Sequence, residues 1–156
     1  MSLEQEVEMI RRFPIFSKIA PAKQKLLCFS SERLSYAADQ VMFEEGDVGN
    51  ECYVVIDGTV EISVKRKLAD GTFGKRVLSV LGRNELIGEI AIFANVPRTA
   101  TATPKSKVEV LMISKDLFLS VIRENPPAAM ELVRILADRL AKNARLLAEL
   151  SEQAHV

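Results

Sequence analysis

A thirteen-residue stretch from Gly88 to Ala100 carries the residue types that bind a small anion. Gly88 precedes a short apolar segment, and a glycine turn into a helix N-terminus leaves backbone N–H groups bare for an anion. Arg98 adds a planar guanidinium, which holds a phosphate in a fixed geometry better than a lysine does. The Glu89 carboxylate would repel a phosphate, so we expect it to accept a hydrogen bond from a hydroxyl. A phosphate and a hydroxyl on one ligand indicate a sugar phosphate.

The segments around this stretch predict short β-strands separated by turns. Residues 52–56 are apolar and end at Asp57-Gly58, which favours a hairpin. Residues 60–65 alternate between apolar and polar, as a half-buried strand does, and Asp70-Gly71 predicts another turn. About eight such strands over residues 31–113 indicate an antiparallel sandwich or barrel, and we predict a jelly-roll β-barrel.

Helical patterns flank the strands on both sides. Pro21 is favoured at the first position of a helix, and Ser114 is a good N-cap for another. The final helix is predicted from about Ala128 to about Ser151. We predict a single, mainly β domain over residues 1–156. N-terminal helices occupy residues 1–30, and C-terminal helices occupy residues 114–156. The jelly roll lies between them at 31–113 and contains the site at 87–100.

The final predicted helix has an apolar stripe that suits a second copy of the chain. Its members follow the three-and-four spacing of a coiled coil and include one polar residue: Val133, Leu136, Leu140, Asn143, Leu147 and Leu150. Roughly 24 helical residues span about 36 Å, which is longer than a small sandwich. We therefore expect a homodimer through the C-terminal helix.

Composition and charge argue against several classes of partner. The 21 Lys and Arg residues balance 21 Asp and Glu residues, so no net field attracts nucleic acid or an anionic membrane. No apolar run approaches the roughly 20 residues of a membrane span, and the distant Cys28 and Cys52 fit a reduced, cytoplasmic protein. We interpret Lys65-Arg66-Lys67 as a solvated hairpin tip, because no aromatic neighbour stands ready to stack on bases. Because the sequence shows no helix-turn-helix pattern, we expect no direct DNA binding. The balanced charge and the lack of a long apolar run also lead us to expect no membrane contact.

The order Gly88-Glu89-Ile90-Ala91-Ile92, followed by Pro97-Arg98-Thr99-Ala100, resembles the phosphate-binding cassette of cyclic nucleotide-binding domains. The resemblance extends over essentially the whole chain and includes glycine turns at Gly46, Gly58 and Gly82. It implies a jelly-roll sensor that binds cyclic AMP or cyclic GMP, with cyclic AMP preferred, and that needs no cofactor. Ligand binding would change the placement of the last helix and so regulate an unknown protein effector.

The resemblance also implies a role for each residue of the cassette. Arg98 would pair with the cyclic phosphate, and the Thr99 hydroxyl would reach the phosphate or a guanine edge. Glu89 would accept the ribose 2′-hydroxyl. The residues that would complete the anion cradle or keep the wall small are Gly88, Ile90, Ala91 and Ala100.

Asn143 is the residue that we expect to contact the base. It falls where members of the family present a polar side chain from the last helix to the purine. An amide can donate and accept together, which matches the N6/N7 edge of adenine and favours cyclic AMP. The alternative is a polar coiled-coil residue that fixes helix register.

Other functions remain to be weighed against a sensor. A cupin-type enzyme needs clustered histidine and carboxylate ligands, and the only histidine is His155, so we expect no catalysis and no metal site. Two cysteines and this histidine are too few for the iron–sulfur cluster or haem of some related regulators. Two alternatives stay open: a structural dimerisation domain that binds no ligand, and a regulatory fragment of a larger signalling protein.

Overall fold

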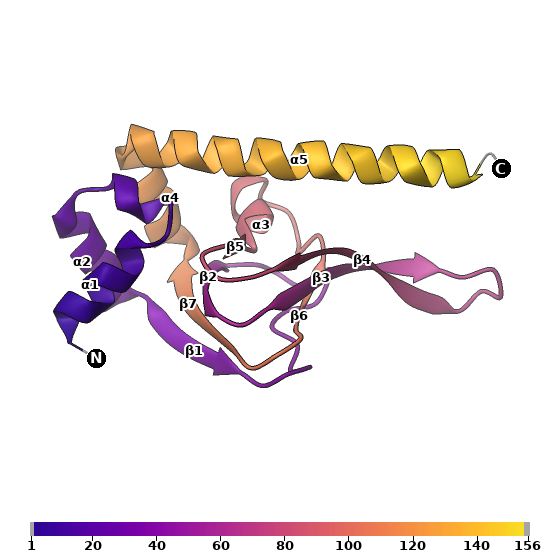
Figure 1. The fold of residues 1–156 in the computed structure, drawn as a ribbon, viewed down its shortest axis with the longest axis horizontal. Helices are drawn as coiled ribbons and strands as arrows, with labels where there is room; N and C mark the ends of the chain where they lie inside the picture. The colour runs from indigo at the N-terminus through magenta and orange to yellow at the C-terminus, as the bar shows by residue number, and fades with distance from the viewer. Residues whose placement is uncertain (1, 155–156) are drawn as a thin grey trace.

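The computed structural model describes residues 2–154, with side chains as far as Glu149. Two β-sheets lie beside the N-terminal helices, and a long C-terminal helix runs above them in the view of Figure 1. The strands are β1 Glu32–Tyr36, β2 Glu51–Asp57, β3 Val60–Lys67, β4 Phe73–Leu81, β5 Leu86–Ile87, β6 Thr101–Pro104 and β7 Val108–Ser114. The helices are α1 Leu3–Arg11, the 3-10 turn η1 Phe16–Lys18, α2 Pro21–Ser30, α3 Glu89–Phe93, α4 Lys115–Glu124 and α5 Pro126–Ala154.

The strands form two separate antiparallel sheets with the orders β1-β7-β2-β5 and β4-β3-β6. This mainly β, jelly-roll-like fold with flanking helices confirms the predicted class, and its two sheets do not close into a barrel. Residues 37–50 form turns and loop rather than a strand that joins the sheets, and their only bridge pairs Phe43 with Ala102. The left-handed backbone of Asp39, at φ 66°, interrupts the extended run there.

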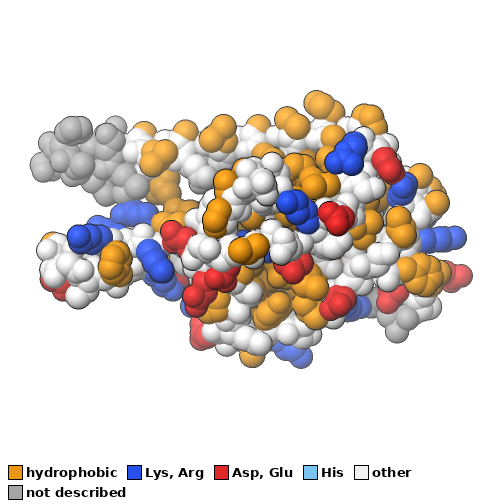
Figure 2. Space-filling model, turned by 180° about the vertical axis from the view of Figure 1, so that it is seen from behind, with side chains coloured by type: hydrophobic (Ala, Val, Ile, Leu, Met, Phe, Trp, Pro, Cys, Tyr) orange, Lys and Arg blue, Asp and Glu red, His pale blue; other side chains and the backbone are white. Residues whose placement is uncertain are grey.

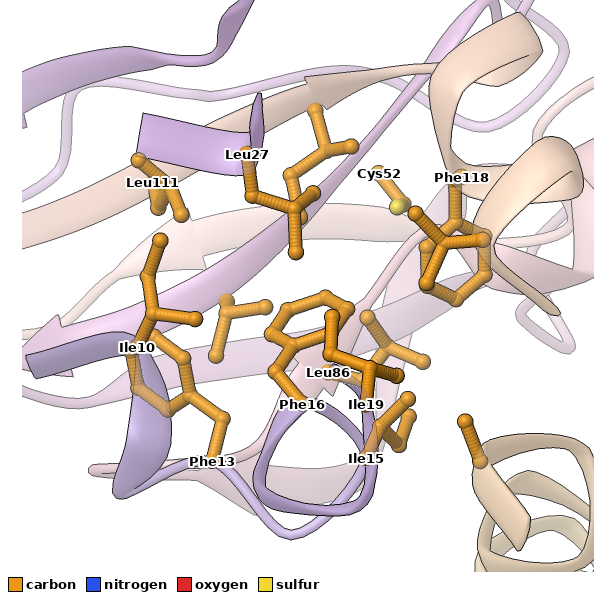
Figure 3. Packing of buried hydrophobic residues seen from close by; sticks show 14 of the residues in the cluster. Ile10, Phe13, Ile15, Phe16, Ile19, Leu27, Cys52, Leu86, Leu111 and Phe118 are labelled. Atoms are coloured by element: carbon orange, nitrogen blue, oxygen red, sulfur yellow. The ribbon is translucent and has the colours of Figure 1, made fainter. Parts of the chain in front are cut away.

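Two apolar cores hold the layers together. The first lies between the four-stranded sheet and the helices, where Phe16 meets Phe118 edge to face with ring centroids 6.3 Å apart. Figure 3 shows Phe16 at the centre of this core, with Ile10 and Phe13 beside it. The second core fills the space between the sheets and includes four buried valines, Val55, Val60, Val108 and Val110. The β-branched residues of the strands account for this second core, because they pack well on a pleated surface.

The helix ends follow local capping rules. The Ser114 hydroxyl accepts a hydrogen bond from the Leu117 N–H at 3.3 Å, which confirms the predicted N-cap of α4. Helix α5 begins at Pro126, two residues earlier than predicted, because proline is well tolerated in the first turn of a helix. Among the described residues, no helix is long and apolar enough to cross a membrane.

Helix α5 has 29 residues, and only its first part packs into the core. Ala128 and Leu132 are buried, and Leu136 is half-buried against the same cluster. Beyond them α5 continues over α3 (Figure 1). The helix is about 44 Å long, so it extends well past the residues that anchor it.

Candidate functional site

Gly88 sits between β5 and α3 and is needed there for two reasons. It is the N-cap of α3 in the left-handed conformation, with φ 85°, which glycine adopts with little strain. A Cβ at this position would also lie 2.5 Å from Nη1 of Arg98. The turn therefore opens the first N–H groups of α3, including those of Ile90 and Ala91, and lets the guanidinium approach.

Arg98 is buried, with 4% of its surface exposed, and is held mainly by neutral groups. Its Nη1 donates to the Gly88 carbonyl at 2.9 Å, and its Nη2 donates to the Glu51 carbonyl at 2.8 Å. The guanidinium lies over the Phe43 ring at 4.1 Å, and the half-exposed Glu51 carboxylate is 3.7 Å from Nη2. Nε of Arg98 is buried and has no hydrogen-bond partner. The site thus contains a fixed cation with a donor left unused.

The loop before β2 closes on Arg98 from the other side. The Arg98 N–H donates to the Asp47 carbonyl at 2.7 Å, and the Gly46 N–H donates to the Arg98 carbonyl at 2.8 Å. A Cβ at Gly49 would lie 2.7 Å from the guanidinium carbon and 2.9 Å from Cβ of Ala91. Gly49 is therefore required for this close packing, a role that the sequence analysis missed. Two glycines three positions apart, at 46 and 49, were the available signal.

Glu89 connects the cassette to α5. Its side chain is buried, with 3% exposed, and its Oε1 accepts a hydrogen bond from Nη1 of Arg139 at 2.6 Å. Nη2 of Arg139 donates to the Leu86 carbonyl at 2.6 Å, so one arginine of α5 binds both ends of the β5–α3 turn. Arg139 was not predicted, because the pair is 50 positions apart and no local pattern links its members. Oε2 of Glu89 has no hydrogen-bond partner among the described residues.

The other predicted site residues differ in how far they are exposed. Ala91 is buried, and Ala100 is half-buried. Ile90, Thr99 and Asn143 are exposed. The structure therefore brings Gly88, Glu89, Ala91 and Arg98 together and leaves the Thr99 and Asn143 side chains open.

Asn143 follows Arg139 by four positions, and residues with this spacing share one side of a helix. It follows the half-buried Leu136 by seven positions and so lies on the domain-facing side of α5. The exposed apolar stripe of α5 borders this side and consists of Met130, Val133, Ala137, Leu140, Ala144 and Leu147. Of the predicted seam, Leu136 packs on the core, and Asn143 lies beside the exposed stripe. The predicted Leu150 side chain lies outside the described residues.

The groups behind the site are uncharged at neutral pH. Burial raises the pKa of the Cys52 thiol well above its usual value, and the Glu89 carboxylate adds to the shift. Cys52 therefore offers no thiolate for nucleophilic attack or metal binding. Burial also raises the pKa of Tyr53 to about 12. The Tyr53 ring stacks on that of Phe43, with centroids 5.9 Å apart, so the floor beneath Arg98 is aromatic and neutral.

No group of three or more His, Cys, Asp or Glu side chains within residues 2–149 could hold a metal ion. His155, the single histidine of the sequence, lies outside the described residues. A cavity of about 400 Å³ occurs elsewhere, between α1 and the sheet, and is lined by Gln5, Met9, Arg12, Arg33 and Ile56. None of these residues belongs to the cassette. The described part of the site thus combines a buried arginine with a buried carboxylate and shows no metal-ligand set.

The family model of the cyclic nucleotide-binding domain matches residues 33–125. The chain is 30% identical over 143 residues to the CRP-like cAMP-activated global transcriptional regulator of Mycobacterium tuberculosis, and the match covers 92% of this chain and 62% of that one. It is 32% identical over 127 residues to the cyclic AMP receptor protein of Thermus thermophilus, with 81% and 57% covered.

Among solved structures, the catabolite activator protein of Thermus thermophilus superposes with a TM-score of 0.71 at 31% identity. This superposition covers 88% of this chain and 63% of that chain. The chain therefore spans about three-fifths of the length of these relatives.

Proposed function

The chain belongs to the cyclic nucleotide-binding domain family, and we propose that it is a sensor for cyclic AMP that reports binding through α5. The observation that carries this proposal is Arg98, a buried guanidinium with an unused donor beside the glycine turn. Leaving a buried donor unpaired is costly, and an anion at this site would remove the cost. A cyclic phosphate carries one negative charge and fits this role.

The phosphate would lie against Arg98 and the first turn of α3. There the N–H groups of Ile90 and Ala91 have no partner within the helix, and the exposed Thr99 hydroxyl can rotate toward the same anion. Gly88 and the small Ala100 leave room for the ribose-phosphate ring. This arrangement concentrates several donors on one small anion, as the cassette resemblance implies.

The ribose 2′-hydroxyl would donate to Glu89. Arg139 occupies only Oε1 of this carboxylate, so Oε2 can accept the hydroxyl while the ion pair persists. The ligand would then connect the cassette to α5 through one carboxylate. A ligand that favours one placement of α5 over another shifts the population of the helix, which is the mechanism that we propose for signalling.

The base would face Asn143. The position of this residue on the domain-facing side of α5, one turn beyond Arg139, supports a base contact over the alternative of a register-fixing seam residue. An amide suits the adenine edge. The names of the two relatives, which refer to cyclic AMP, also support this nucleotide over cyclic GMP.

We also propose that the exposed stripe of α5 binds a second copy of the chain, and that the output goes to a protein effector. Four large apolar residues of this stripe are more than half exposed: Met130, Val133, Leu140 and Leu147. Together with Ala137 and Ala144 they follow the three-and-four spacing of a coiled coil. A purely structural dimerisation domain is the second candidate, because this stripe alone would account for it. Since the relatives that we compared are regulators, we propose a regulatory rather than an enzymatic role.

Isothermal titration calorimetry of the full chain with cyclic AMP and cyclic GMP tests the proposal. We expect saturable binding of both, with cyclic AMP tighter. Asn143→Ala is expected to reduce the preference for cyclic AMP by about 1–3 kcal/mol, the typical value of one bidentate amide–adenine contact. Lys142→Ala, a change at the neighbouring residue of another helix side, is the control and should leave the preference unchanged.

Absence of saturable heat with either nucleotide would leave the dimerisation domain as the function. Saturable binding with the same preference in wild-type and Asn143→Ala protein would remove Asn143 from the base contact and leave the phosphate site intact.

A further inference from the structure

The β3–β4 hairpin extends away from the two sheets as a narrow ribbon (Figure 1). Its outer part, residues 65–76, contains five basic residues and one acidic residue, although the whole chain has no net charge. The basic residues are Lys65, Arg66, Lys67, Lys75 and Arg76. Figure 2 shows blue side chains gathered along this hairpin, with orange side chains among them.

The register of the hairpin places like charges directly opposite each other. Lys65 faces Lys75 across the two strands, and like charges in this position destabilise a sheet. Lys75 is partly compensated, because its Nζ lies 2.5 Å from Glu61. Lys65, Arg66, Lys67 and Arg76 pair with no carboxylate among the residues whose side chains are described. The folded protein gains little from these charges, which suggests a partner outside the chain.

Each face of the ribbon ends in an exposed apolar residue. Phe73, which is 70% exposed, lies opposite Lys67. Leu68, which is 41% exposed, packs over Gly74 on the other face, beside Arg66. Phe73 is six positions from Lys67 in the sequence, and only the pairing of the two strands places it opposite this lysine.

The one acidic residue of the outer hairpin is used within the turn. The Asp70 carboxylate accepts hydrogen bonds from the Thr72 N–H at 2.9 Å and from the Thr72 hydroxyl at 2.6 Å. These bonds lower the pKa of Asp70, so it remains ionised and fixes the turn between Leu68 and Phe73. The turn therefore holds both apolar side chains at the far end of the ribbon.

Along the ribbon, apolar residues lie outermost and basic residues lie behind them on both faces. We propose that this hairpin tip, residues 65–76, docks end-on to an anionic lipid surface. Phe73 and Leu68 would enter the interface, and the basic residues behind them would contact lipid phosphates, with their long stems along the apolar layer. The groove of a nucleic acid duplex would match the charges but would offer no apolar layer to the tip.

Co-sedimentation of the full chain with vesicles tests this proposal. We expect binding to phosphatidylcholine vesicles that contain phosphatidylserine, weakened by salt, and none to vesicles of phosphatidylcholine alone. Lys65→Gln with Lys67→Gln should weaken binding roughly 25-fold, because each basic residue near an anionic surface contributes about fivefold. Phe73→Ser should weaken binding about tenfold through lost apolar burial. Melting curves of each variant check that it folds.

The matched control is Lys25→Gln with Lys107→Gln, which removes two exposed lysines from other surfaces. Equal losses in the two double variants, or equal binding to both kinds of vesicle, would overturn the proposal. Binding of a DNA oligonucleotide that the hairpin variants lose, with no binding to anionic vesicles, would also overturn it in favour of nucleic acid. Unchanged vesicle binding in Phe73→Ser would contradict the insertion of the tip.

Discussion

Arg98 is the residue on which the proposed phosphate site depends. Two backbone carbonyls and the face of Phe43 fix its guanidinium, and each of these partners comes from a different part of the chain. Carbonyls and an aromatic face orient a cation without cancelling its charge. The arginine is thus oriented before the ligand arrives, which lowers the ordering cost of binding.

Arg98→Ala should weaken cyclic AMP binding by roughly 2–5 kcal/mol, the usual loss when one partner of a buried charge pair is removed. Calorimetric titration of the variant measures this change. Arg134→Ala is the control, because Arg134 is an exposed arginine of α5 that pairs with Glu131 on its own helix. A loss smaller than about tenfold in Arg98→Ala would contradict the phosphate role.

Helix α5 is the element that joins the cassette to the rest of the molecule, and it presents two different sides. Leu132 and Leu136 anchor the first side to the core, and Arg139 binds the β5–α3 turn from the same side. The second side carries the exposed apolar stripe. Among the described residues, Arg139 makes the hydrogen bonds that link the distal part of α5 to the cassette. We therefore expect Arg139 to determine how tightly α5 packs against the cassette.

Arg139→Ala should lower the free energy of unfolding by about 1.5–3 kcal/mol, because hydrogen bonds to charged groups are lost and Glu89 stays buried. Urea unfolding measures the loss, and amide hydrogen exchange of α5 beyond residue 136 should become faster. Arg145→Ala, which removes an exposed arginine of the same helix, should change neither quantity. Equal effects of the two variants would show that Arg139 does not hold the helix.

At the scale of the whole molecule, the two sheets form a compact body from which α5 and the β3–β4 hairpin extend (Figure 1). Both extensions expose apolar residues that the body does not cover, at Leu140 and Leu147 on the helix and at Phe73 on the hairpin. We assign the helix stripe to a second copy of the chain and the hairpin tip to a lipid surface. The chain spans about three-fifths of the length of the relatives compared above. A role in a larger protein or assembly is therefore a proposal as well.

Leu140→Asp should convert a two-chain species into a monomer, because a charge in the middle of an apolar seam is costly to bury. Analytical ultracentrifugation of the full chain over a range of concentrations measures the change. Arg145→Asp, placed on another side of α5, should leave the dimer intact. A wild-type protein that stays monomeric at the highest concentration would exclude the proposed dimer.

Local sequence patterns were enough to predict the cassette and most of the elements. Gly88, Glu89 and Arg98 lie within one short segment, so their spacing alone brought them together. The strands around Gly58 and the helix cap at Ser114 also depend on neighbouring residues. The separation of the two sheets was not predicted, because it depends on residues 37–50, where the left-handed backbone of Asp39 interrupts the extended run.

The sequence by itself determined the class of fold and one half of the proposed site, because strand periodicity, turns and the cassette are all contacts between near neighbours. The tertiary structure alone decided that Phe43, Glu51 and Gly49 surround Arg98, and that Arg139 binds Glu89. It also decided which side of α5 is exposed and that Phe73 lies beside Lys67. These contacts depend on how sheets, helices and turns pack in space, and no local spacing of residues encodes that packing.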